Sequence, residues 1–289
     1  MKIKVFQKGF NYSQDGAGNR LVYHLQGCNM HCPWCANPEG IAPNGTLMVD
    51  EPYLIDTICP LKAIYQKKIN RSICNVCELK ECITLHRTRG IRLSYKFYEA
   101  DEIIEEAKRS TPLFYDGGGV TFSGGEATLQ FEALKLILKS LKASGIHTAI
   151  ETNATHPNLE SLFPFIDQLI MDFKHYNEAK HRQVTGLSNH MIKENIKKAL
   201  SLHPSVLIRI PLIKDFNDAK KDAENFASFF KQYQTQRVSF ECLPYHEYGK
   251  VKWQQCGMAY TMQDAYIDTK TRILYEEVFK NNDLLMIQT

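Results

Sequence analysis

Three cysteines near the N-terminus carry the clearest chemical signal in this 289-residue sequence. Cys28, Cys32 and Cys35 lie in the segment GCNMHCPWCANPEG, with three and then two residues between them. Three thiolates can bind three irons of a cubic four-iron cluster, which leaves the fourth iron open to an exogenous ligand. Structural zinc is the alternative, but it needs a fourth ligand, and neither His24 nor His31 has a zinc-finger spacing from these cysteines. The spacing therefore favours an iron–sulfur cluster with an open coordination position.

Four further cysteines form a second group, and two stand apart. The chain has nine cysteines in all. The second group is Cys59, Cys74, Cys77 and Cys82, whereas Cys242 and Cys256 are expected to be ordinary structural thiols. No export signal is recognisable, and reducing compartments keep thiols free for metals or catalysis. We therefore expect metal-binding cysteines, no disulfides and a cytoplasmic protein.

Short apolar segments alternate with amphipathic ones along most of the chain, which is typical of a parallel sheet with crossover helices. The expected strands are Leu21–Leu25, Val120–Ser123, His147–Glu151, Gln168–Asp172, Val206–Pro211 and Val238–Leu243. Six units fit better than eight. The predicted fold is therefore α/β, a partial (β/α)6 barrel similar to a TIM barrel, formed by residues 1–289.

The expected helices follow these strands. Ala100–Ser110 has Asp101 as its predicted N-cap. An apolar stripe that ends before Gly145 predicts a second helix, and its members are Leu129, Phe131, Leu134, Ile137, Leu138 and Leu141. Further helices are expected at Asn189–Leu202, Asp218–Tyr233 and Met262–Phe279. Residues 45–91 interrupt the alternation and carry the second cysteine group, which indicates a small inserted module.

A glycine-rich turn and an acid–lysine pair follow two of the predicted strands. One of the strands is followed by Gly124, Gly125 and Glu126. Glycine has no side chain, so a ligand could approach the backbone here. The alternative is an ordinary tight turn without a ligand. Asp172 and Lys174 end another strand and share one of its faces because strand side chains alternate. A surface ion pair is the simple interpretation, and charge recognition of a bound carboxylate is the functional one.

Arg209 and His246 are expected at the ends of the last two predicted strands. The carboxyl ends of barrel strands face one mouth, where ligand groups collect. Either residue alone would be weak evidence for a site, since arginine and histidine are common at the edge of a core. Together with the preceding motifs, they predict a ligand pocket at this mouth.

Composition restricts the classes of partner. The formal net charge is +3, and Lys and Arg are scattered rather than clustered, so nucleic acid is not expected. No apolar segment approaches the roughly 20 residues of a membrane span. We therefore expect neither nucleic-acid nor membrane binding.

The first cysteine group resembles the signature of the radical S-adenosylmethionine (SAM) superfamily, which has the same spacing and an aromatic residue before the last cysteine, here Trp34. The resemblance implies a [4Fe-4S] cluster whose open iron chelates SAM and whose electron cleaves SAM to methionine and a 5′-deoxyadenosyl radical. It places Trp34 near adenine, the glycine-rich loop and the Glu126 side chain near the methionine amino group, and His246 near the adenosyl portion. The SAM contacts it implies are Trp34, Cys35, Ala36, Gly124, Gly125, Glu126, Thr152, Asp172, Lys174, Arg209 and His246.

Further segments resemble the enzymes that activate glycyl-radical enzymes, such as pyruvate formate-lyase activating enzyme. They cover most of the chain and are SQDGAGNR, CANPE, GGGVTFSGGEATLQ, MDFKH, VTGLSNHMIKEN, IRIPLIKDFND and LPYHEYGKVKW. Ala17 departs from the usual Asp-Gly-Pro-Gly, which loosens a turn but removes no chemical group. The resemblance implies that Asp172 and Lys174 orient SAM. It also makes Glu151, Thr152, Met171 and Asp172 candidate ligands of a monovalent cation.

The reaction implied by the resemblance is abstraction of an α-hydrogen from one backbone glycine of a partner glycyl-radical enzyme. The SAM-derived radical performs it, so no catalytic side chain is required, and a flavodoxin or ferredoxin-type protein would donate the electron. The partner must present its glycine on a flexible segment, and the face with the cysteine loop and LPYHEYGK is the expected docking surface. The alternatives are another radical SAM reaction on a peptide, small molecule or anaerobic ribonucleotide reductase, or a non-enzymatic electron carrier or zinc-organised module.

The insert resembles a reduced form of the ferredoxin-like module found in many of these activating enzymes. The full module has two runs of Cys-x2-Cys-x2-Cys-x3-Cys-Pro, and the last cysteine of each run binds the other run's cluster. Cys59 resembles the last cysteine of the first run, and Cys74, Cys77 and Cys82 resemble the first three of the second. These four would complete one auxiliary [4Fe-4S] cluster. Structural zinc is the rival, because four thiolates suit it equally well.

Overall fold

Six parallel strands form the sheet that positions the cysteine loop. The computed structural model describes residues 1–10, 15–56, 59–78, 81–85, 90–233 and 237–288. The strands are β2 (Arg20–Leu25), β8 (Gly119–Gly124), β9 (Thr148–Thr152), β10 (Gln168–Asp172), β11 (Val206–Leu212) and β12 (Val238–Pro244). Each lies within one residue of its predicted bounds, and their parallel order β2-β8-β9-β10-β11-β12 confirms the partial (β/α)6 barrel.

Two strands that the sequence analysis did not predict extend this sheet. β1 (Lys2–Phe10) pairs antiparallel with β2, and β7 (Lys96–Glu99) pairs antiparallel with β1. At the opposite edge, Phe240 of β12 exchanges backbone hydrogen bonds with the C-terminal segment: its N–H donates to Leu285, and its carbonyl accepts from Ile287. The two edge strands of the parallel sheet, β2 and β12, therefore each have a pairing segment on their outer side.

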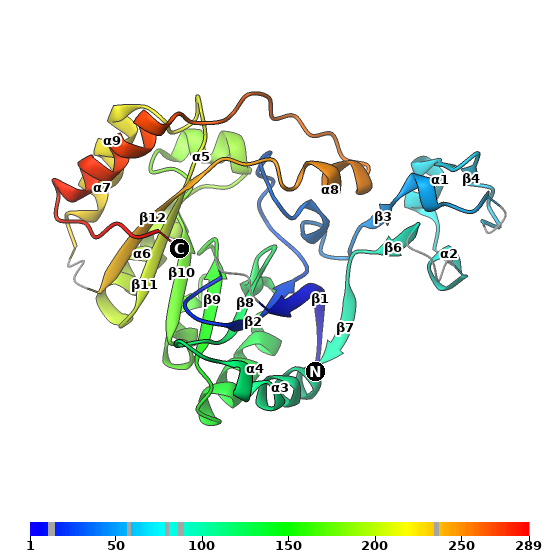
Figure 1. Cartoon of the computed structure of the whole chain (residues 1–289), viewed down its shortest axis with the longest axis horizontal. Coiled ribbons are helices and arrows are strands. Elements are labelled where there is room, and N and C mark those ends of the chain that lie inside the picture. The colour runs from blue at the N-terminus through cyan, green and yellow to red at the C-terminus, as the bar shows by residue number, and fades with distance from the viewer. Residues whose placement is uncertain (11–14, 57–58, 79–80, 86–89, 234–236, 289) are drawn as a thin grey trace.

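Helices cover the outer face of the sheet and close the hydrophobic core. They are α3 (Ala100–Arg109), α4 (Phe131–Ala143), α6 (His190–Leu202), α7 (Lys220–Phe230) and α9 (Thr269–Lys280). Their buried faces and the outward side chains of the strands form one large cluster, in which Val120, Ile150 and Ile208 are fully buried. Figure 1 shows α3 and α4 together at one end and α7 and α9 at the other. None of the helices in the described ranges is long and apolar enough to cross a membrane.

The N-cap of α3 and the starts of α7 and α9 differ from the predictions, and α7 spans Lys220–Phe230 rather than Asp218–Tyr233. Glu99, not Asp101, is the N-cap of α3, because its side chain and that of Glu102 form a reciprocal capping box. The predicted helix from Met262 is wrong over its first seven residues, since α9 begins only at Thr269. Asp268 fixes that start by accepting a hydrogen bond from the Thr271 N–H at 2.7 Å.

The apolar stripe before Gly145 predicts α4, but the stripe begins about one turn before this helix does. The segment Ala127–Gln130 is a 3-10 helix, and Leu129 is 44% exposed rather than packed in the core. The remaining members from Leu134 to Leu141 are buried as expected. Two shorter helices, α5 (Glu178–Thr185) and α8 (Lys250–Gln255), were not predicted.

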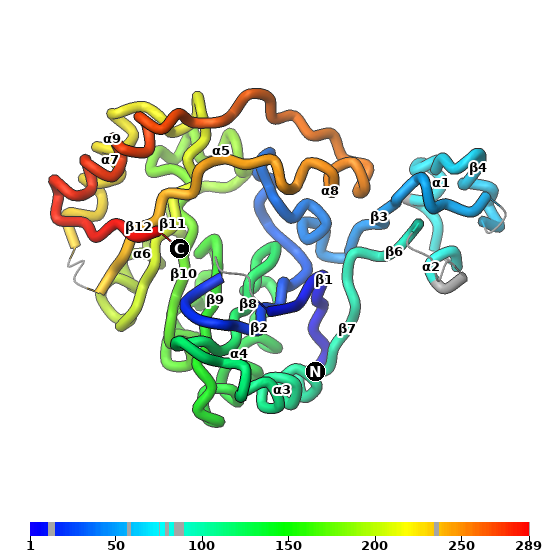
Figure 2. The backbone as a smooth tube through the Cα atoms, in the orientation of Figure 1, coloured from blue at the N-terminus to red at the C-terminus, as the bar shows by residue number. Residues whose placement is uncertain are grey.

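The cysteine-containing insert leaves and re-enters the barrel through paired strands. β3 (Leu47–Val49) and β6 (Ile91–Leu93) are antiparallel, and between them lie β4 (Ile64–Tyr65), β5 (Lys68–Ile69), α1 (Arg71–Val76) and α2 (Glu81–Leu85). A small separate core contains Val49, Leu54, Ile64 and Ile91. The backbone trace shows this part projecting sideways from the barrel (Figure 2).

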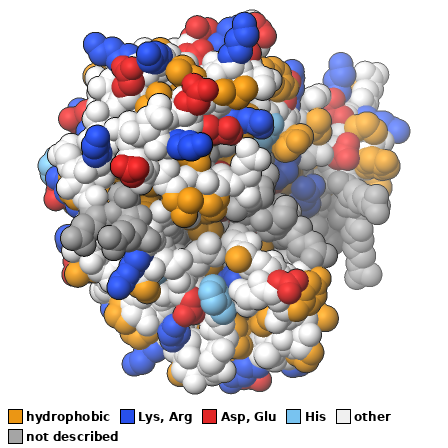
Figure 3. All heavy atoms as spheres, turned by 60° about the vertical axis from the view of Figure 1, so that its left-hand side comes forward, with side chains coloured by type: hydrophobic (Ala, Val, Ile, Leu, Met, Phe, Trp, Pro, Cys, Tyr) orange, Lys and Arg blue, Asp and Glu red, His pale blue; other side chains and the backbone are white. Residues whose placement is uncertain are grey.

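The surface of the barrel carries mixed charges. On the face shown in Figure 3, Lys and Arg side chains are interspersed with Asp and Glu. This distribution agrees with the small formal net charge of +3.

Candidate active site

The segment with the first three cysteines is a closed loop after β2. At its base, the N–H of Gly27 donates to the Gly40 carbonyl at 2.8 Å, and the N–H of Cys28 donates to Ile41 at 2.9 Å. The buried Gln26 side chain also donates to the carbonyls of Glu39 and Ala42. These bonds fix where the loop leaves and returns to the barrel.

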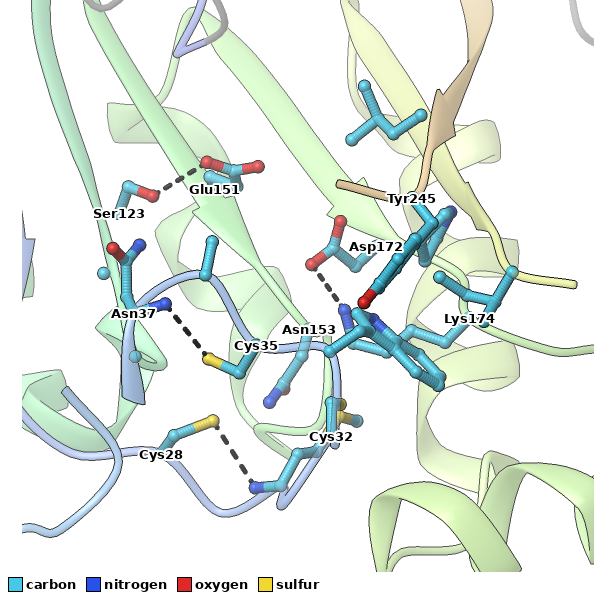
Figure 4. A pocket seen from close by; sticks show the side chains of 18 of the residues that line it. Cys28, Cys32, Cys35, Asn37, Ser123, Glu151, Asn153, Asp172, Lys174 and Tyr245 are labelled. Atoms are coloured by element: carbon cyan, nitrogen blue, oxygen red, sulfur yellow. Dashed lines mark hydrogen bonds and ion pairs between the residues drawn. The ribbon is translucent and has the colours of Figure 1, made fainter. Parts of the chain in front are cut away.

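All three cysteines of this loop line one cavity of about 230 Å³. Figure 4 shows Cys28, Cys32 and Cys35 on one side of this pocket. Two backbone N–H groups donate to their sulfur atoms: Met30 to Cys28 and Asn37 to Cys35, each at 3.4 Å. Backbone N–H groups commonly donate hydrogen bonds to the cysteine sulfurs that bind iron–sulfur clusters.

Burial keeps these thiols protonated in the absence of a cation. It raises the pKa of Cys28 and of Cys35 to about 12, and that of Cys32 in the same direction. A positively charged metal group at this place would reverse that effect, because metal ligation favours the thiolate. The donor set and its position on one cavity wall therefore fit a cluster held by three thiolates.

The glycine-rich loop after β8 packs directly on the cysteine loop. The Gly125 N–H donates to Leu25 at 3.0 Å, and the Glu126 N–H donates to Gly27 at 2.6 Å. A Cβ atom on Gly125 would lie 2.2 Å from the Gly27 carbonyl oxygen, and Gly124 has a φ of +121°. Glycine is therefore required here by backbone contact between the two loops as well as by the open pocket wall.

Glu126 is turned away from the pocket. Its carboxylate accepts hydrogen bonds from the Thr128 N–H at 2.9 Å, the Thr152 hydroxyl at 2.7 Å and the Asn153 N–H at 2.6 Å. The side chain is 1% exposed and is not among the residues that line the cavity. It ties the ends of β8 and β9 together, which differs from the predicted contact with a ligand.

Asp172 and Lys174 face the cysteines from the end of β10. The Lys174 Nζ lies 2.9 Å from Asp172 Oδ2, and both residues line the cavity beside Tyr245 (Figure 4). Burial alone would lower the pKa of Lys174, but Asp172 and then the Cys32 thiol outweigh it and raise the pKa overall. The lysine is thus a buried permanent cation at the pocket wall, and the interpretation as a surface ion pair is wrong.

Arg209 lies deeper than predicted. It is in the middle of β11, 2% exposed, and it is absent from the cavity lining. Its guanidinium donates to Glu151 of β9 and to Glu241 of β12, each at 2.8 Å. Arg209 therefore joins three strands inside the barrel beneath the pocket.

Glu151 and Asp172 already have cationic partners, which bears on the predicted monovalent-cation site. Glu151 Oε1 accepts from Arg209, and Oε2 accepts from the Ser123 hydroxyl at 2.7 Å. Asp172 is paired with Lys174. Glu151 and Asp172 therefore each have a cationic partner within the chain, and the monovalent-cation site stays a prediction.

Asp15 forms a buried acid pair with Glu151, which the sequence analysis missed. Burial, and next the negative charge of Glu151, raise the pKa of Asp15 from 3.8 to about 8. For Glu151, burial alone would raise the pKa, but Arg209 and Ser123 lower it overall. One proton is therefore held between the two carboxyls, mainly on Asp15.

Asp15→Asn should flatten the pH dependence of stability. Between about pH 4 and 8 the folded protein keeps a proton on Asp15 that the unfolded chain has released, so stability falls as pH rises through this window. The introduced amide cannot ionise, yet it can still donate a hydrogen bond to Glu151. Unfolding by urea under anaerobic conditions at pH 5.5 and 8.5 measures the effect, and an unchanged difference between the two pH values would contradict the assignment.

Aromatic and apolar side chains form the remaining wall of the pocket. Trp34 lines it and packs on Phe216 at 5.1 Å between ring centroids. His246 lies two residues beyond the end of β12 and stacks on the exposed Tyr248 at 4.3 Å. Pro211, Ile213, Leu243, Pro244 and Tyr245 complete this wall. These residues follow strand ends but have no distinctive spacing, so periodicity alone could not identify them.

Most of the predicted ligand contacts meet in this one cavity. Those that line it are Cys28, Cys32, Trp34, Cys35, Ala36, Gly124, Gly125, Glu151, Thr152, Asp172, Lys174 and His246. Glu126, Arg209 and Met171 do not line it. The cavity combines a thiol wall, a lysine and an apolar wall, which fits a cluster together with an amino-acid and nucleoside ligand such as SAM.

The second cysteine group lies together in the insert. Cys74 is on α1 and Cys77 is its C-cap, while Cys82 is on α2. Burial raises the pKa of Cys74, and the neighbouring Cys59, Cys82 and Cys77 raise it further. These thiols therefore influence one another, although within the described ranges no group of three or more His, Cys, Asp or Glu side chains is arranged to hold a single metal ion.

Comparison with known proteins agrees with this geometry. The profile of the radical SAM superfamily matches residues 22–227. The chain is 33% identical to the 4-hydroxyphenylacetate decarboxylase activating enzyme of Clostridioides difficile (strain CD196), covering 93% of this chain and 90% of that protein. It is 30% identical to the isethionate sulfite-lyase activating enzyme of Nitratidesulfovibrio vulgaris, covering 91% of each.

A solved structure gives the same result. A domain of pyruvate-formate lyase-activating enzyme from Bacteroides vulgatus superimposes with a TM-score of 0.50 and 26% identity, covering 59% of this chain and 98% of that one. The chain therefore belongs to the radical SAM superfamily and, within it, to the activating enzymes of glycyl-radical enzymes.

Proposed function

We propose that this protein removes an α-hydrogen from a backbone glycine of a partner enzyme and leaves a glycyl radical there. The observation that carries the proposal is the shared cavity, in which Cys28, Cys32 and Cys35 face the Asp172–Lys174 pair at the carboxyl ends of the strands. Barrel enzymes place their chemistry at this end. The activating enzymes similar to this chain support the reaction class.

The chain's own residues bind and orient the cofactors. Cys28, Cys32 and Cys35 would ligate three irons of the cluster. Lys174, held by Asp172 at 2.9 Å, would donate to the SAM carboxylate, for which a buried ammonium is a strong partner. The carbonyls of Gly124 and Gly125 would accept from the SAM amino group.

The adenosyl portion would lie against the apolar wall. Trp34 and His246 line the cavity on this side, and Ile213 and Leu243 add aliphatic surface. This wall excludes water from a reactive carbon centre, which protects it from side reactions. When bound, the reduced cluster and SAM would supply the chemistry, namely an electron for cleavage of the sulfonium C–S bond and a 5′-deoxyadenosyl radical for removal of the glycine hydrogen. No side chain is needed as a base.

The partner's glycine must reach this cavity from outside the barrel. A glycine inside a folded domain cannot do so, and we therefore expect a flexible segment that docks at the face bearing the cysteine loop and residues 243–250. Tyr248 of this segment is exposed, and so is Val251 directly after it. A flavodoxin or ferredoxin-type protein is the proposed electron donor.

The test combines the reduced protein, SAM and a panel of glycyl-radical enzymes. The panel should include 4-hydroxyphenylacetate decarboxylase, isethionate sulfite-lyase and pyruvate formate-lyase, together with any glycyl-radical enzyme encoded beside this chain. We expect a glycyl signal in electron paramagnetic resonance with one member, and deuterium transfer to 5′-deoxyadenosine when that member carries α-deuterated glycine. SAM cleavage without a glycyl signal from any member would favour a different radical SAM reaction.

We further propose that Cys59, Cys74, Cys77 and Cys82 ligate one auxiliary [4Fe-4S] cluster in a reduced ferredoxin-like module at residues 45–91. The spacing of the four cysteines, which resembles parts of two ferredoxin runs, and the electrostatic influence of the neighbouring thiols on Cys74 and Cys82 support this proposal. Electron relay and partner docking are the proposed uses.

Metal analysis of anaerobically purified protein should find about eight iron atoms per chain, four for each cluster. Cys74→Ser should reduce this to about four while the radical cluster still binds SAM. Protein with about four iron atoms and one zinc per chain would instead identify the insert as a zinc site.

A further inference from the structure

Helix α8 lies across the outside of the cysteine loop. It packs on the 3-10 turn Pro38–Gly40 of that loop and on β3 of the insert. Contact begins at Gly249, the N-cap of α8, where a Cβ atom would lie 2.7 Å from the Cys35 carbonyl oxygen. The helix is thus placed between the first cysteine group and the insert.

Two side chains of α8 hold the segment around Cys35. Trp253 Nε1 donates to the Cys35 carbonyl at 2.9 Å. Lys252 Nζ donates to Asn37 Oδ1 at 2.8 Å and pairs with the buried Glu39 at 2.8 Å. Asn37 is also the residue whose backbone N–H donates to Cys35 Sγ at 3.4 Å. Trp253 therefore holds the backbone at Cys35, and Lys252 holds the side chain of Asn37. These are the two residues that the N–H···S hydrogen bond joins.

The insert holds the other end of the same helix. Arg71 is the first residue of α1, the helix that carries Cys74, and its guanidinium donates to the Gln255 carbonyl at 2.6 Å and to Leu47 at 3.0 Å. Gly257 lies beside the Arg71 side chain and has a φ of +70°, a backbone conformation that favours glycine. A continuous set of hydrogen bonds thus runs from the helix with Cys74 to the backbone at Cys35.

We propose that α8 is a rigid connection between the insert and the cysteine loop, here called the strut. Through it, Lys252, Trp253 and Arg71 act as positioning residues for the radical cluster, the cluster at Cys28, Cys32 and Cys35. Hydrogen bonds to cluster sulfurs, and the orientation of the groups that contact the cluster's ligands, change its reduction potential. The Asn37 N–H stabilises negative charge on Cys35 Sγ and so favours the reduced cluster. The insert therefore has a mechanical role at the radical site in addition to any electron transfer. This inference rests on the proposed function only in requiring an iron–sulfur cluster at Cys28, Cys32 and Cys35.

The experiment is a redox titration of the full-length protein with both metal sites loaded, followed by electron paramagnetic resonance. Adding SAM identifies the radical cluster, since SAM changes only the signal of the cluster that binds it. Trp253→Phe keeps most of the ring but removes the N–H. We expect a more negative potential, an altered signal of the reduced cluster and about a tenfold slower SAM cleavage, within the range for outer-shell partners of metal sites.

Arg71→Gln should shift the potential in the same direction but less, because it loosens the far end of the strut. The double variant should shift it no further than Trp253→Phe alone, since both changes release the same helix. Gln254→Ala is the matched control: it is on the same helix, but its side chain is exposed and it lies outside residues 243–250. Its potential should equal that of the wild type.

Lys252 provides a second test if Trp253→Phe fails to incorporate iron. Lys252→Gln should lower the potential, and Lys252→Arg should restore it, because arginine keeps the pair with Glu39. Full iron content with unchanged potentials in the Trp253 and Lys252 variants would overturn the strut while leaving the proposed function intact. A wild-type protein without a SAM-responsive cluster would overturn both.

Discussion

Replacing Cys32 by alanine should abolish the radical chemistry. Cys32 is 7% exposed and faces the cavity between the other two thiols and Lys174. Within the described cavity lining, Cys28 and Cys35 are the other thiols, so no spare ligand can take its place. Iron should fall by about four atoms per chain. SAM cleavage should fall by more than about a hundredfold, because loss of an outer-shell partner alone costs roughly 10- to 100-fold.

Anaerobic iron analysis and 5′-deoxyadenosine formation measure this result without a partner protein. Cys242→Ala is the matched control, since it removes a thiol of β12 outside the cavity lining and should leave both quantities unchanged. A glycyl signal that persists in a partner treated with the Cys32→Ala protein would show that the cysteine loop does not generate the radical.

Replacing Arg209 by methionine should destabilise the fold strongly. The substitution leaves Glu151 and Glu241, each held at 2.8 Å by the guanidinium, without their cation inside the barrel. Breaking a buried ion pair by removing one partner costs about 3 to 5 kcal/mol. The loss should also raise the pKa of Glu151, which Arg209 holds down, and so weaken stability most at high pH.

Urea unfolding of the variant and the wild type under anaerobic conditions gives this free-energy difference. Arg272→Met is the control, because its exposed pair with Glu276 at 3.5 Å on α9 should be worth no more than about 0.5 kcal/mol. Adding Glu241→Gln to Arg209→Met should recover part of the loss, since it removes one uncompensated charge. Equal stability of the Arg209 and Arg272 variants would mean that the three-strand network contributes little.

Arg209 and Glu126 show where motif-based prediction reached its limit. Both belong to segments that resemble ligand-binding motifs, and both were assigned to SAM. In the folded chain their polar groups bind other strands: Arg209 binds Glu151 and Glu241, and Glu126 binds Thr152 and Asn153. A motif marks a position near the site, but the direction of a side chain depends on partners that are distant in sequence.

The sheet was predicted more accurately than the helix ends. Continuous apolar runs such as Val206–Leu212 are typical of strands that are buried on both faces of a parallel sheet, so they predict the strands well. The start of α9 depends instead on one hydrogen bond from Thr271 to Asp268, a local competition that periodicity does not resolve. Antiparallel β1 and β7 were missed because they add to a sheet edge, where pairing with distant residues decides the structure.

The sequence by itself determined the chemical class of this protein. The spacing of Cys28, Cys32 and Cys35 and the order of the later motifs are local properties of the chain, and they were sufficient for the superfamily and the six-unit barrel. Which charged side chains pair with one another depends on the tertiary structure. The proton between Asp15 and Glu151, and the pairing of Arg209 with Glu151, arise from segments brought together by folding. Burial makes each of these groups depend on its neighbours, and those neighbours are set by the packing of the barrel.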